Sequence, residues 1–249
     1  RRDLEGDEDA CPMVVGRTFR GIENRPSPRW LQTRLEAIGL RPISALVDIT
    51  NYVTIDLCRP LHVFDAGKIE ADLTMRFAKP GEEIVALDGN TYALEDGMTV
   101  IADGRAVHGI GGVMGGEASG CTEDTTDVFL EVALFDPIRT ATTGRKLGIE
   151  SDARYRFERG LDPESALWGA EVAARLILEF CGGEASALTI AGEMPEWRRE
   201  VALRPDRLQT FGGVDVGPER ATEILNALGF EAKSSGGVIK AITPSWRAD

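Results

Sequence analysis

The sequence contains few cysteines, few histidines and no long apolar run. Among its 249 residues there are 4 Cys and 2 His, and no apolar run approaches the roughly 18 residues that a membrane span requires. The cysteines are too scattered for a zinc site or a redox CxxC pair; they are Cys11, Cys58, Cys121 and Cys181. We therefore expect no metal site and no membrane segment, and the sparse use of cysteine favours the reducing cytoplasm.

Basic residues are also scarce. The 28 Lys and Arg residues stand against 41 Asp and Glu residues, so the formal net charge is −13. Phosphate neutralisation needs clustered Lys and Arg, so this balance argues against a protein whose whole surface binds nucleic acid. One local cluster is a candidate contact, namely Arg139, Arg145, Lys146, Arg154, Arg156 and Arg159. The alternative is a solvated loop and helix face, and charge alone does not separate the two.

The composition along the chain indicates an α+β protein with two domains. We expect residues 1–9 to be a frayed, acidic lead-in, and residues 10–185 to form a β-rich mixed domain with flanking helices. Residues 186–198 have the Gly, Pro and mixed charge of a linker. Residues 199–249 predict the N-terminal part of a winged-helix-like α/β domain that is cut short. Because the chain begins with Arg1, shows no signal sequence and breaks off after a strand-like run, we expect a piece of a larger protein.

Two segments of the first domain are predicted to be helices. Residues 27–39 place Ser27 as cap and Pro28 at the first position of a helix, with an apolar face and a terminal glycine. Residues 162–181 begin with Asp162 as cap and end before two glycines. In the second domain a strand is expected at 201–204, a helix at about 218–228, and a hairpin that turns at 234–237.

The rest of the first domain is predicted to be strand and loop. Residues 43–55 are rich in β-branched side chains, and polar residues interrupt the apolar pattern in a way that marks an edge or a site. Residues 73–116 contain short β-like runs separated by turn sequences, as in successive hairpins. Residues 128–135 predict a strand, and residues 136–153 a polar loop.

Several common catalytic motifs are absent from the sequence. The glycines at 109–116 do not complete a phosphate-binding loop, since no Lys-Ser or Lys-Thr follows them. There is no GxSxG elbow and no HExxH helix, which disfavours nucleophilic or metal-dependent hydrolysis. Of the two histidines, His108 reads as a packed or exposed residue. His62 follows Pro60 within the polar interruption of the β pattern, and it is the stronger candidate.

One carboxylate stands out from its surroundings. Glu131 lies in the middle of the run VFLEVALF, which predicts a strand buried on both faces. An unpaired polar group there costs about 1–3 kcal/mol, and an ionised group costs more. Something must therefore donate a hydrogen bond to Glu131. Either an internal arginine or backbone amide does so, or the residue forms the floor of a pocket whose ligand carries the donor.

Five separated motifs resemble one family. The segments VDITNYVTIDLCRPLHVFD, GGVMGGEASG, VFLEVALF, SDARYRFERGLDP and TPSWRAD together resemble the β subunit of bacterial phenylalanyl-tRNA synthetase, in the same order and over essentially the whole chain. The resemblance implies the editing domain and the start of the domain that follows it. It also implies that this piece lacks the aminoacylation site, which belongs to the α subunit, and that it hydrolyses tyrosine wrongly attached to tRNA(Phe).

The resemblance also implies a set of site residues. Glu131 corresponds to the residue that meets the tyrosine hydroxyl, and His62 to the one that places the water or the terminal adenosine. Ser151 stands where the family is expected to have Thr, and the shorter side chain could loosen the pocket. The other implied pocket residues are Arg41, Thr50, Asn51, Pro60, Gly115 and Ala153.

These implications make a consistent hypothesis. A phenylalanine pocket rejects an added hydroxyl only about 10²-fold, so accuracy needs a second site that selects the hydroxyl. The expected partners are tRNA(Phe), mainly its aminoacylated 3′ end, and the α subunit in an (αβ)2 parent. No cofactor is expected for this piece, whereas the parent enzyme would use ATP and Mg²⁺. The alternative is a tRNA-positioning and subunit-assembly module that no longer edits.

Overall fold

The structure is a computed structural model that describes residues 1–4 and 6–248. The chain divides into two compact units, Arg1–Pro195 and Glu196–Asp249. Both units mix helices and strands, so the predicted α+β class is confirmed. Among the described residues no helix is both long enough and apolar enough to cross a membrane.

The first unit is built on an antiparallel sheet of strands from distant parts of the chain. Its order is β11-β2-β10-β3, and β12 also pairs with β2. Strand β10 lies between β2 and β3, so both of its edges are paired, and all but one of its residues are buried, which confirms the buried strand predicted at 128–135. The strands are β2 (Met13–Arg20), β3 (His62–Asp65), β10 (Val128–Ala133), β11 (Glu184–Ala185) and β12 (Thr189–Gly192).

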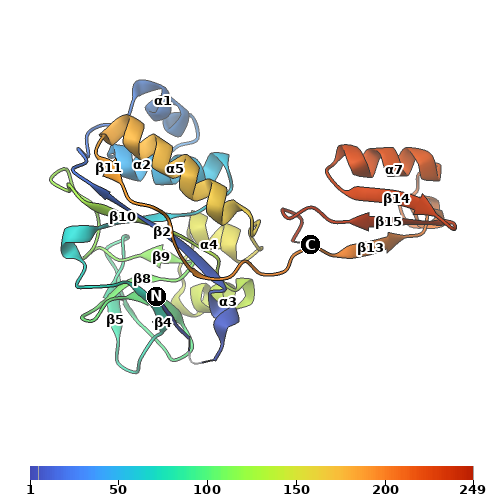
Figure 1. Cartoon of the computed structure of the whole chain (residues 1–249). Helices are drawn as coiled ribbons and strands as arrows, with labels where there is room; N and C mark the ends of the chain where they lie inside the picture. Colours follow the sequence, from blue (N-terminus) through green and yellow to red (C-terminus); the bar gives the residue numbers. More distant parts are fainter. Residues whose placement is uncertain (5, 249) are drawn as a thin grey trace. The chain divides into compact units, whose positions relative to one another are not determined.

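Helices cover one face of this sheet (Figure 1). They are α1 (Arg29–Ala37), α2 (Ala45–Asp56) and α5 (Ser165–Cys181). Successive side chains of a strand point to opposite faces, and Val128, Leu130 and Val132 share the helix-facing core with buried alanines of α5. Glu131 therefore belongs to the opposite face.

A second sheet packs toward that opposite face. Its order is β1-β4-β7-β8-β9, and an apolar cluster that includes Phe64, Phe135 and Phe157 lies between the sheets. The hairpins predicted within 73–116 are confirmed in part, because β5–β6 and β7–β8 are hairpins of neighbouring runs, whereas β4 pairs with β7. The strands are β1 (Arg2–Asp3), β4 (Thr74–Phe77), β7 (Thr99–Ala102), β8 (Val107–Ile110) and β9 (Met114–Gly115), with a separate pair β5 (Glu83–Val85) and β6 (Thr91–Ala93).

The strand-like interpretation of residues 43–55 is wrong, because this segment is helix α2. Leu46, Ile49 and Val53 recur at helical spacing, and all three are fully buried. Packing of this apolar face overrides the β propensity of its branched residues. The polar interruption at Asp48 is structural: its carboxylate accepts hydrogen bonds from the Ile43 amide at 2.9 Å and from the Ser27 hydroxyl at 2.5 Å.

The loop predicted at 136–153 is also wrong, since it holds helices α3 (Pro137–Leu147) and α4 (Asp152–Phe157). Asp136 caps α3 by accepting a hydrogen bond from the Arg139 amide at 2.6 Å, and Gly148 ends the helix with φ 68°. These are ordinary cap signals. The high content of threonine and glycine inside α3 concealed them.

Smaller corrections concern the ends of elements. Helix α1 begins at Arg29 and Ser27 does not cap it, because the Ser27 hydroxyl donates to Asp48. Helix α5 begins at Ser165, and Asp162 accepts from the Glu164 amide in the turn before it.

Both segments expected to lack regular structure contain strands. The expected lead-in contains β1, which pairs with β4, and the short helix η1 (Glu8–Ala10); its Leu4 is fully buried. The expected linker contains β12, which pairs with β2.

The second unit is a three-stranded sheet with short helices. Its order is β13-β15-β14, and the predicted hairpin is the β14–β15 connection. A small core around Ile239 and three buried alanines holds α7 to the sheet. The elements are β13 (Glu200–Leu203), α6 (Asp206–Thr210), α7 (Pro218–Ala227), β14 (Glu231–Ser235) and β15 (Val238–Ile242).

Candidate functional site

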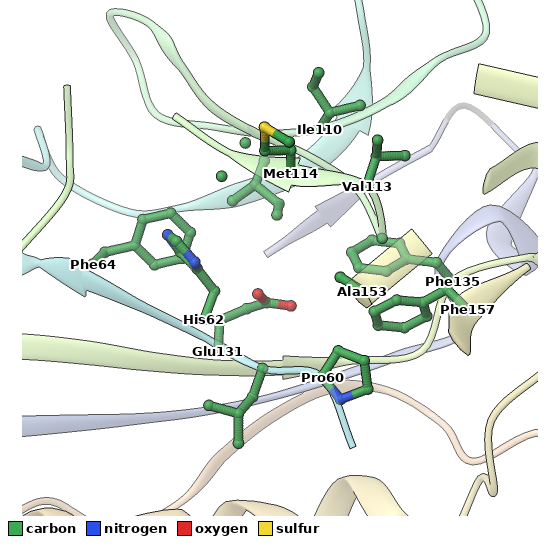
Figure 2. Close-up of a pocket in the computed structure, with 15 residues that line it drawn as sticks. Pro60, His62, Phe64, Ile110, Val113, Met114, Glu131, Phe135, Ala153 and Phe157 are labelled. Carbon is green, nitrogen blue, oxygen red and sulfur yellow. The ribbon is translucent and has the colours of Figure 1, made fainter. Parts of the chain in front are cut away.

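A cavity of about 70 Å³ lies between the two sheets of the first unit. Strands β3 and β10 supply one wall, β8, β9 and the turn between them supply another, and α4 closes one side (Figure 2). The lining is almost wholly apolar, and among the described residues only Glu131 and His62 of the lining are ionisable. The remaining lining residues are Pro60, Leu61, Phe64, Ile101, Gly109, Ile110, Gly112, Val113, Met114, Gly115, Phe135, Ala153 and Phe157.

The sheet register brings the two polar residues together. Glu131 on β10 is directly opposite His62 on β3, and residues opposed in an antiparallel pair share one face of the sheet. Figure 2 shows both side chains directed into the cavity, with Phe135 and Phe157 across from the carboxylate. Residues far apart in sequence therefore form one polar corner of an apolar pocket.

The Glu131 carboxylate is buried and has no hydrogen-bond donor among the described residues. The residue is 4% exposed. Burial raises the pKa of its carboxyl from 4.5 to about 7, and the charge of Arg59 acts in the opposite direction. An ionised carboxylate in this position lacks the partners that such groups normally have. A ligand that carries a hydroxyl or amine would supply the missing donor.

His62 is a neutral imidazole at physiological pH. Burial lowers its pKa from 6.5 to about 4. Its ring packs edge-on to Phe64 with the ring centroids 4.5 Å apart, and its Nε2 atom is buried with no hydrogen-bond partner among the described groups. A neutral imidazole of this kind can hold a water molecule or a ligand hydroxyl.

Gly115 sits directly against His62. A Cβ atom at position 115 would lie 2.9 Å from Nε2 of His62 and closer still to Cε1. Only a residue without a side chain fits there while the imidazole keeps its position. Pro60 lines the cavity just before His62, and Ala153 lines it from α4.

Ser151 lies outside the cavity lining and holds one of its walls. Its hydroxyl accepts a hydrogen bond from the Arg154 amide at 3.0 Å, which caps α4, and donates to the carbonyl of Val113 at 2.5 Å. Val113 belongs to the lining. Ser151, which was expected in the pocket, therefore supports the lining residue Val113 and does not itself line the cavity.

Arg41, Thr50 and Asn51 are also outside the cavity lining. Arg41 is exposed ahead of α2, and Thr50 and Asn51 are half-buried on α2 itself. The Thr50 hydroxyl donates to the carbonyl of Val47 at 2.8 Å, within its own helix. The structure thus brings five of the sequence-predicted residues into one cavity, namely Pro60, His62, Gly115, Glu131 and Ala153.

Sequence reasoning missed Arg59 and the aromatic wall. Arg59 precedes Pro60 and is fully buried. Phe135, just after β10, and Phe157, at the end of α4, lie across the cavity from the Glu131 carboxylate. Glu131 itself was a signal for a buried cation, and an internal arginine was one of the two alternatives. Nothing in the sequence separates Arg59 from the exposed arginines.

The lining contains no serine, threonine, cysteine or lysine that could serve as a nucleophile. Among the described residues no group of His, Cys, Asp and Glu is arranged to hold a metal ion. What the arrangement offers is an apolar space for an aromatic or aliphatic body, an acceptor for one donor group, and a neutral imidazole beside it.

Comparison with known proteins identifies the family. Residues 10–182 match the model of the B3/4 domain, and residues 201–249 match that of the tRNA synthetase B5 domain. The chain belongs to the B3/4 domain family. The cavity lies wholly within the B3/4 match, since its lining runs from Pro60 to Phe157.

Curated relatives are similar to almost the whole of this chain. The β subunit of phenylalanine–tRNA ligase from Paramagnetospirillum magneticum is 56% identical over 98% of the chain, and that from Rhodospirillum rubrum is 57% identical over 96%. The β subunit from Brucella abortus is 52% identical over 98%. The resemblance predicted from the five motifs is therefore confirmed.

The chain spans about 30% of the length of these curated relatives. Among solved structures, it is similar to an N-terminal fragment of the phenylalanyl-tRNA synthetase β subunit from Pyrococcus horikoshii. The identity is 14% and the TM-score 0.44, with 100% of this chain and 69% of that chain covered.

Proposed function

We propose that this chain is the editing module of a phenylalanine–tRNA ligase β subunit, and that it hydrolyses tyrosine esterified to tRNA(Phe). The observation that carries the proposal is the unpartnered Glu131 carboxylate, directed into an apolar cavity beside the unpartnered Nε2 of His62. A buried imidazole nitrogen without a partner and a carboxylate in an apolar cavity are costly unless a ligand or water completes their hydrogen bonds.

The cavity suits a ligand with an aromatic body and one donor. Phe135 and Phe157, whose ring centroids are 5.3 Å apart, provide an apolar wall opposite Glu131. A tyrosine hydroxyl would donate to the carboxylate. A phenylalanine ring would leave the carboxylate buried and unpaired, at a cost of about 1–3 kcal/mol. The site would therefore reject the correct amino acid and accept the incorrect one, as a second sieve must.

In this proposal, hydrolysis uses water and no enzyme nucleophile. The water oxygen bonds to the ester carbon, the bond from that carbon to the ribose oxygen breaks, and a proton from water reaches the departing ribose oxygen. His62, with a pKa of about 4, is a weak base and acts by holding the water in place. A neighbouring hydroxyl of the terminal ribose would relay the proton.

The wider assignment extends what the names of the relatives say, which is that they are β subunits of a phenylalanine–tRNA ligase. The partners would be tRNA(Phe), especially its aminoacylated 3′ end, and a synthetase α subunit in an (αβ)2 enzyme in the cytoplasm. The ATP- and Mg²⁺-dependent ligation would belong to the α subunit. A tRNA-positioning module without editing would have no use for the two unpaired groups in the cavity, so we favour hydrolysis.

The test compares deacylation of Tyr-tRNA(Phe) and Phe-tRNA(Phe) by the assembled ligase. With Glu131→Ala the ratio of the two rates should fall roughly 10- to 150-fold, which is the loss of one hydrogen bond to a charged group. With His62→Ala both rates should fall and their order should be kept. Glu83→Ala, on the exposed face of β5, is the matched control.

Two results would contradict the proposal. If the wild-type ligase does not deacylate Tyr-tRNA(Phe), the chain is a positioning module. If Glu131→Ala lowers both rates equally, Glu131 belongs to the catalytic machinery or the fold and does not select the substrate.

A further inference from the structure

Arg59 is the largest side chain that is fully buried in the described structure, and the proposed chemistry does not use it. It lies between Cys58 and Pro60, directly before β3, and Pro60 lines the cavity. An ionised guanidinium in such a place is unstable unless charge and hydrogen bonds compensate it. The surroundings of Arg59 show what compensates it.

A dedicated socket holds the guanidinium. It donates to the carbonyl of Ala133 on β10, two residues after Glu131, and to the hydroxyl of Ser165 at 3.4 Å. The guanidinium carbon, Cζ of Arg59, lies 5.7 Å from the centroid of the Phe157 ring. The stem fits against α5 only because residue 169 is glycine, where a Cβ atom would lie 2.8 Å from Cγ of Arg59.

The socket contains no contact ion pair. The negative groups that act on Arg59 are Glu131 on the cavity side and Asp162 ahead of α5. Burial lowers the pKa of Arg59 to about 10, so it stays protonated at neutral pH. Among the described residues, Arg59 and Glu131 are therefore opposite charges that attract each other without a direct ion pair, and the Glu131 carboxylate faces the cavity.

We propose that Arg59 is a positioning residue that keeps the Glu131 carboxylate ionised and unblocked, and thereby sets the preference of the cavity for a ligand with a hydroxyl donor. This inference rests on the proposed function. An ionised acceptor selects tyrosine strongly, whereas a protonated carboxyl tolerates an apolar ring better. The charge of Arg59 thus controls specificity at a distance from the reacting atoms.

Few other groups can influence Glu131. His62 faces it from β3, and the Cys11 thiol, whose pKa burial raises to about 12, lies before β2. The cavity residues contributed by the second sheet and by α4 are apolar or glycine. Since His62 and Cys11 are both neutral near pH 7, Arg59 is the charge that opposes the protonation of Glu131.

The experiment measures the Tyr-to-Phe deacylation ratio of the assembled ligase between pH 5.5 and 9. In the wild type the ratio should rise through a midpoint near pH 7, the pKa of Glu131. Arg59→Gln removes the charge but keeps a donor for the Ala133 carbonyl. Its midpoint should move up by about one pH unit, so the ratio at pH 7 should fall about fivefold. Arg59→Lys keeps the positive charge, so its midpoint should stay at the wild-type value.

Arg76→Met is the matched control. It removes a mostly buried arginine that pairs with Glu82 at 2.6 Å, away from the cavity lining. It should lower thermal stability and leave the midpoint unchanged.

A second measurement does not depend on activity. In the 249-residue chain with ¹³C-labelled glutamate, the Glu131 carboxyl signal, assigned by its loss in Glu131→Gln, reports the titration directly. Its midpoint should rise in Arg59→Gln and in Arg59→Met. An unmoved midpoint in whichever of these variants folds overturns the role of Arg59. Absence of Tyr-tRNA(Phe) hydrolysis by the wild type instead overturns the proposed function, and the carbon titration then still decides on Arg59.

Discussion

At the scale of single residues, the sequence identified Glu131 as an unusual buried carboxylate but did not show which charged group acts on it. Glu131 stood out because apolar residues surround it on both sides. Both alternatives for its partner turn out to apply in part, since a buried arginine attracts it and its oxygens nevertheless face a cavity. Arg59 was not predictable, because burial of an arginine depends on packing against α5 and Ala133, which lie far away in sequence.

The two buried ionisable residues should affect stability in opposite directions. The pKa of Glu131 rises from 4.5 to about 7 on folding, so its contribution to the free energy of unfolding falls as pH rises between these values. The pKa of His62 falls from 6.5 to about 4, so its contribution falls as pH drops between these values. Each effect amounts to about 3 kcal/mol, and together they nearly cancel in the wild type.

Single variants should separate these contributions. Relative to the wild type, Glu131→Gln should lose stability as pH falls from 6.5 to 4, because only the His62 effect remains. His62→Asn should gain stability as pH falls from 7 to 4.5. Urea unfolding of the 249-residue chain at several pH values measures both. Parallel pH curves for the wild type and both variants would contradict this prediction, because they would show that folding shifts the pKa of neither residue.

At the scale of elements, turn residues predicted the secondary structure better than the β propensity of branched side chains did. The β5–β6 hairpin was predictable because Gly89, with φ 80°, closes its turn. Helix α2 was not, because its β-branched residues favour strands locally and become helical only by packing on α5. Thr50 and Asn51 were placed in the site partly for that reason.

The close packing of β9 against the His62 imidazole on β3 should depend on Gly115 having no side chain. In Gly115→Ala the new methyl group would lie 2.9 Å from Nε2 of His62, so the imidazole must turn away from its position over the cavity. Misplacing a positioning group by about 1 Å costs on the order of 10²-fold in rate. Deacylation of Tyr-tRNA(Phe) by the assembled ligase should fall by about that factor.

Gly104→Ala is the control for this variant. Residue 104 lies in the exposed β7–β8 turn, where an added Cβ atom meets nothing within 4 Å. This variant should retain full activity. Equal loss of activity in both variants would show that the effect is general and does not act through His62.

At the scale of the whole molecule, the sequence predicted the order of regions but not their assembly. A β-rich region, a long helix and a smaller second unit follow one another as expected. The pairing of β10 with both β2 and β3 was not predictable, because no local signal sets the register of strands distant in sequence. That register is what places Glu131 opposite His62.

The basic cluster predicted as an RNA contact is largely neutralised within the fold. Five of its six members form ion pairs: Arg139 with Asp7, Lys146 with Glu95, Arg156 with Asp152, and Arg154 and Arg159 with Glu158. Among the described residues, only the exposed Arg145 of the cluster has no such partner. With a net charge of −13, the chain offers little to a phosphate backbone.

Isolated from any partner, the 249-residue chain should therefore bind tRNA(Phe) weakly, with a dissociation constant of about 10⁻⁴ to 10⁻⁶ M at physiological salt. Among the described residues of the cluster Arg145 is the one free cation, so binding through the cluster predicts a slope near −1 when the logarithm of the association constant is plotted against that of the salt concentration. Fluorescence anisotropy with labelled tRNA measures both quantities. Arg145→Ala should flatten the slope, whereas Arg156→Ala should not, because Arg156 already neutralises Asp152. A slope of about −4 or steeper would mean that the ion pairs open on binding and that the whole cluster contacts phosphate. In that case this unit would itself make several of the contacts that hold the tRNA.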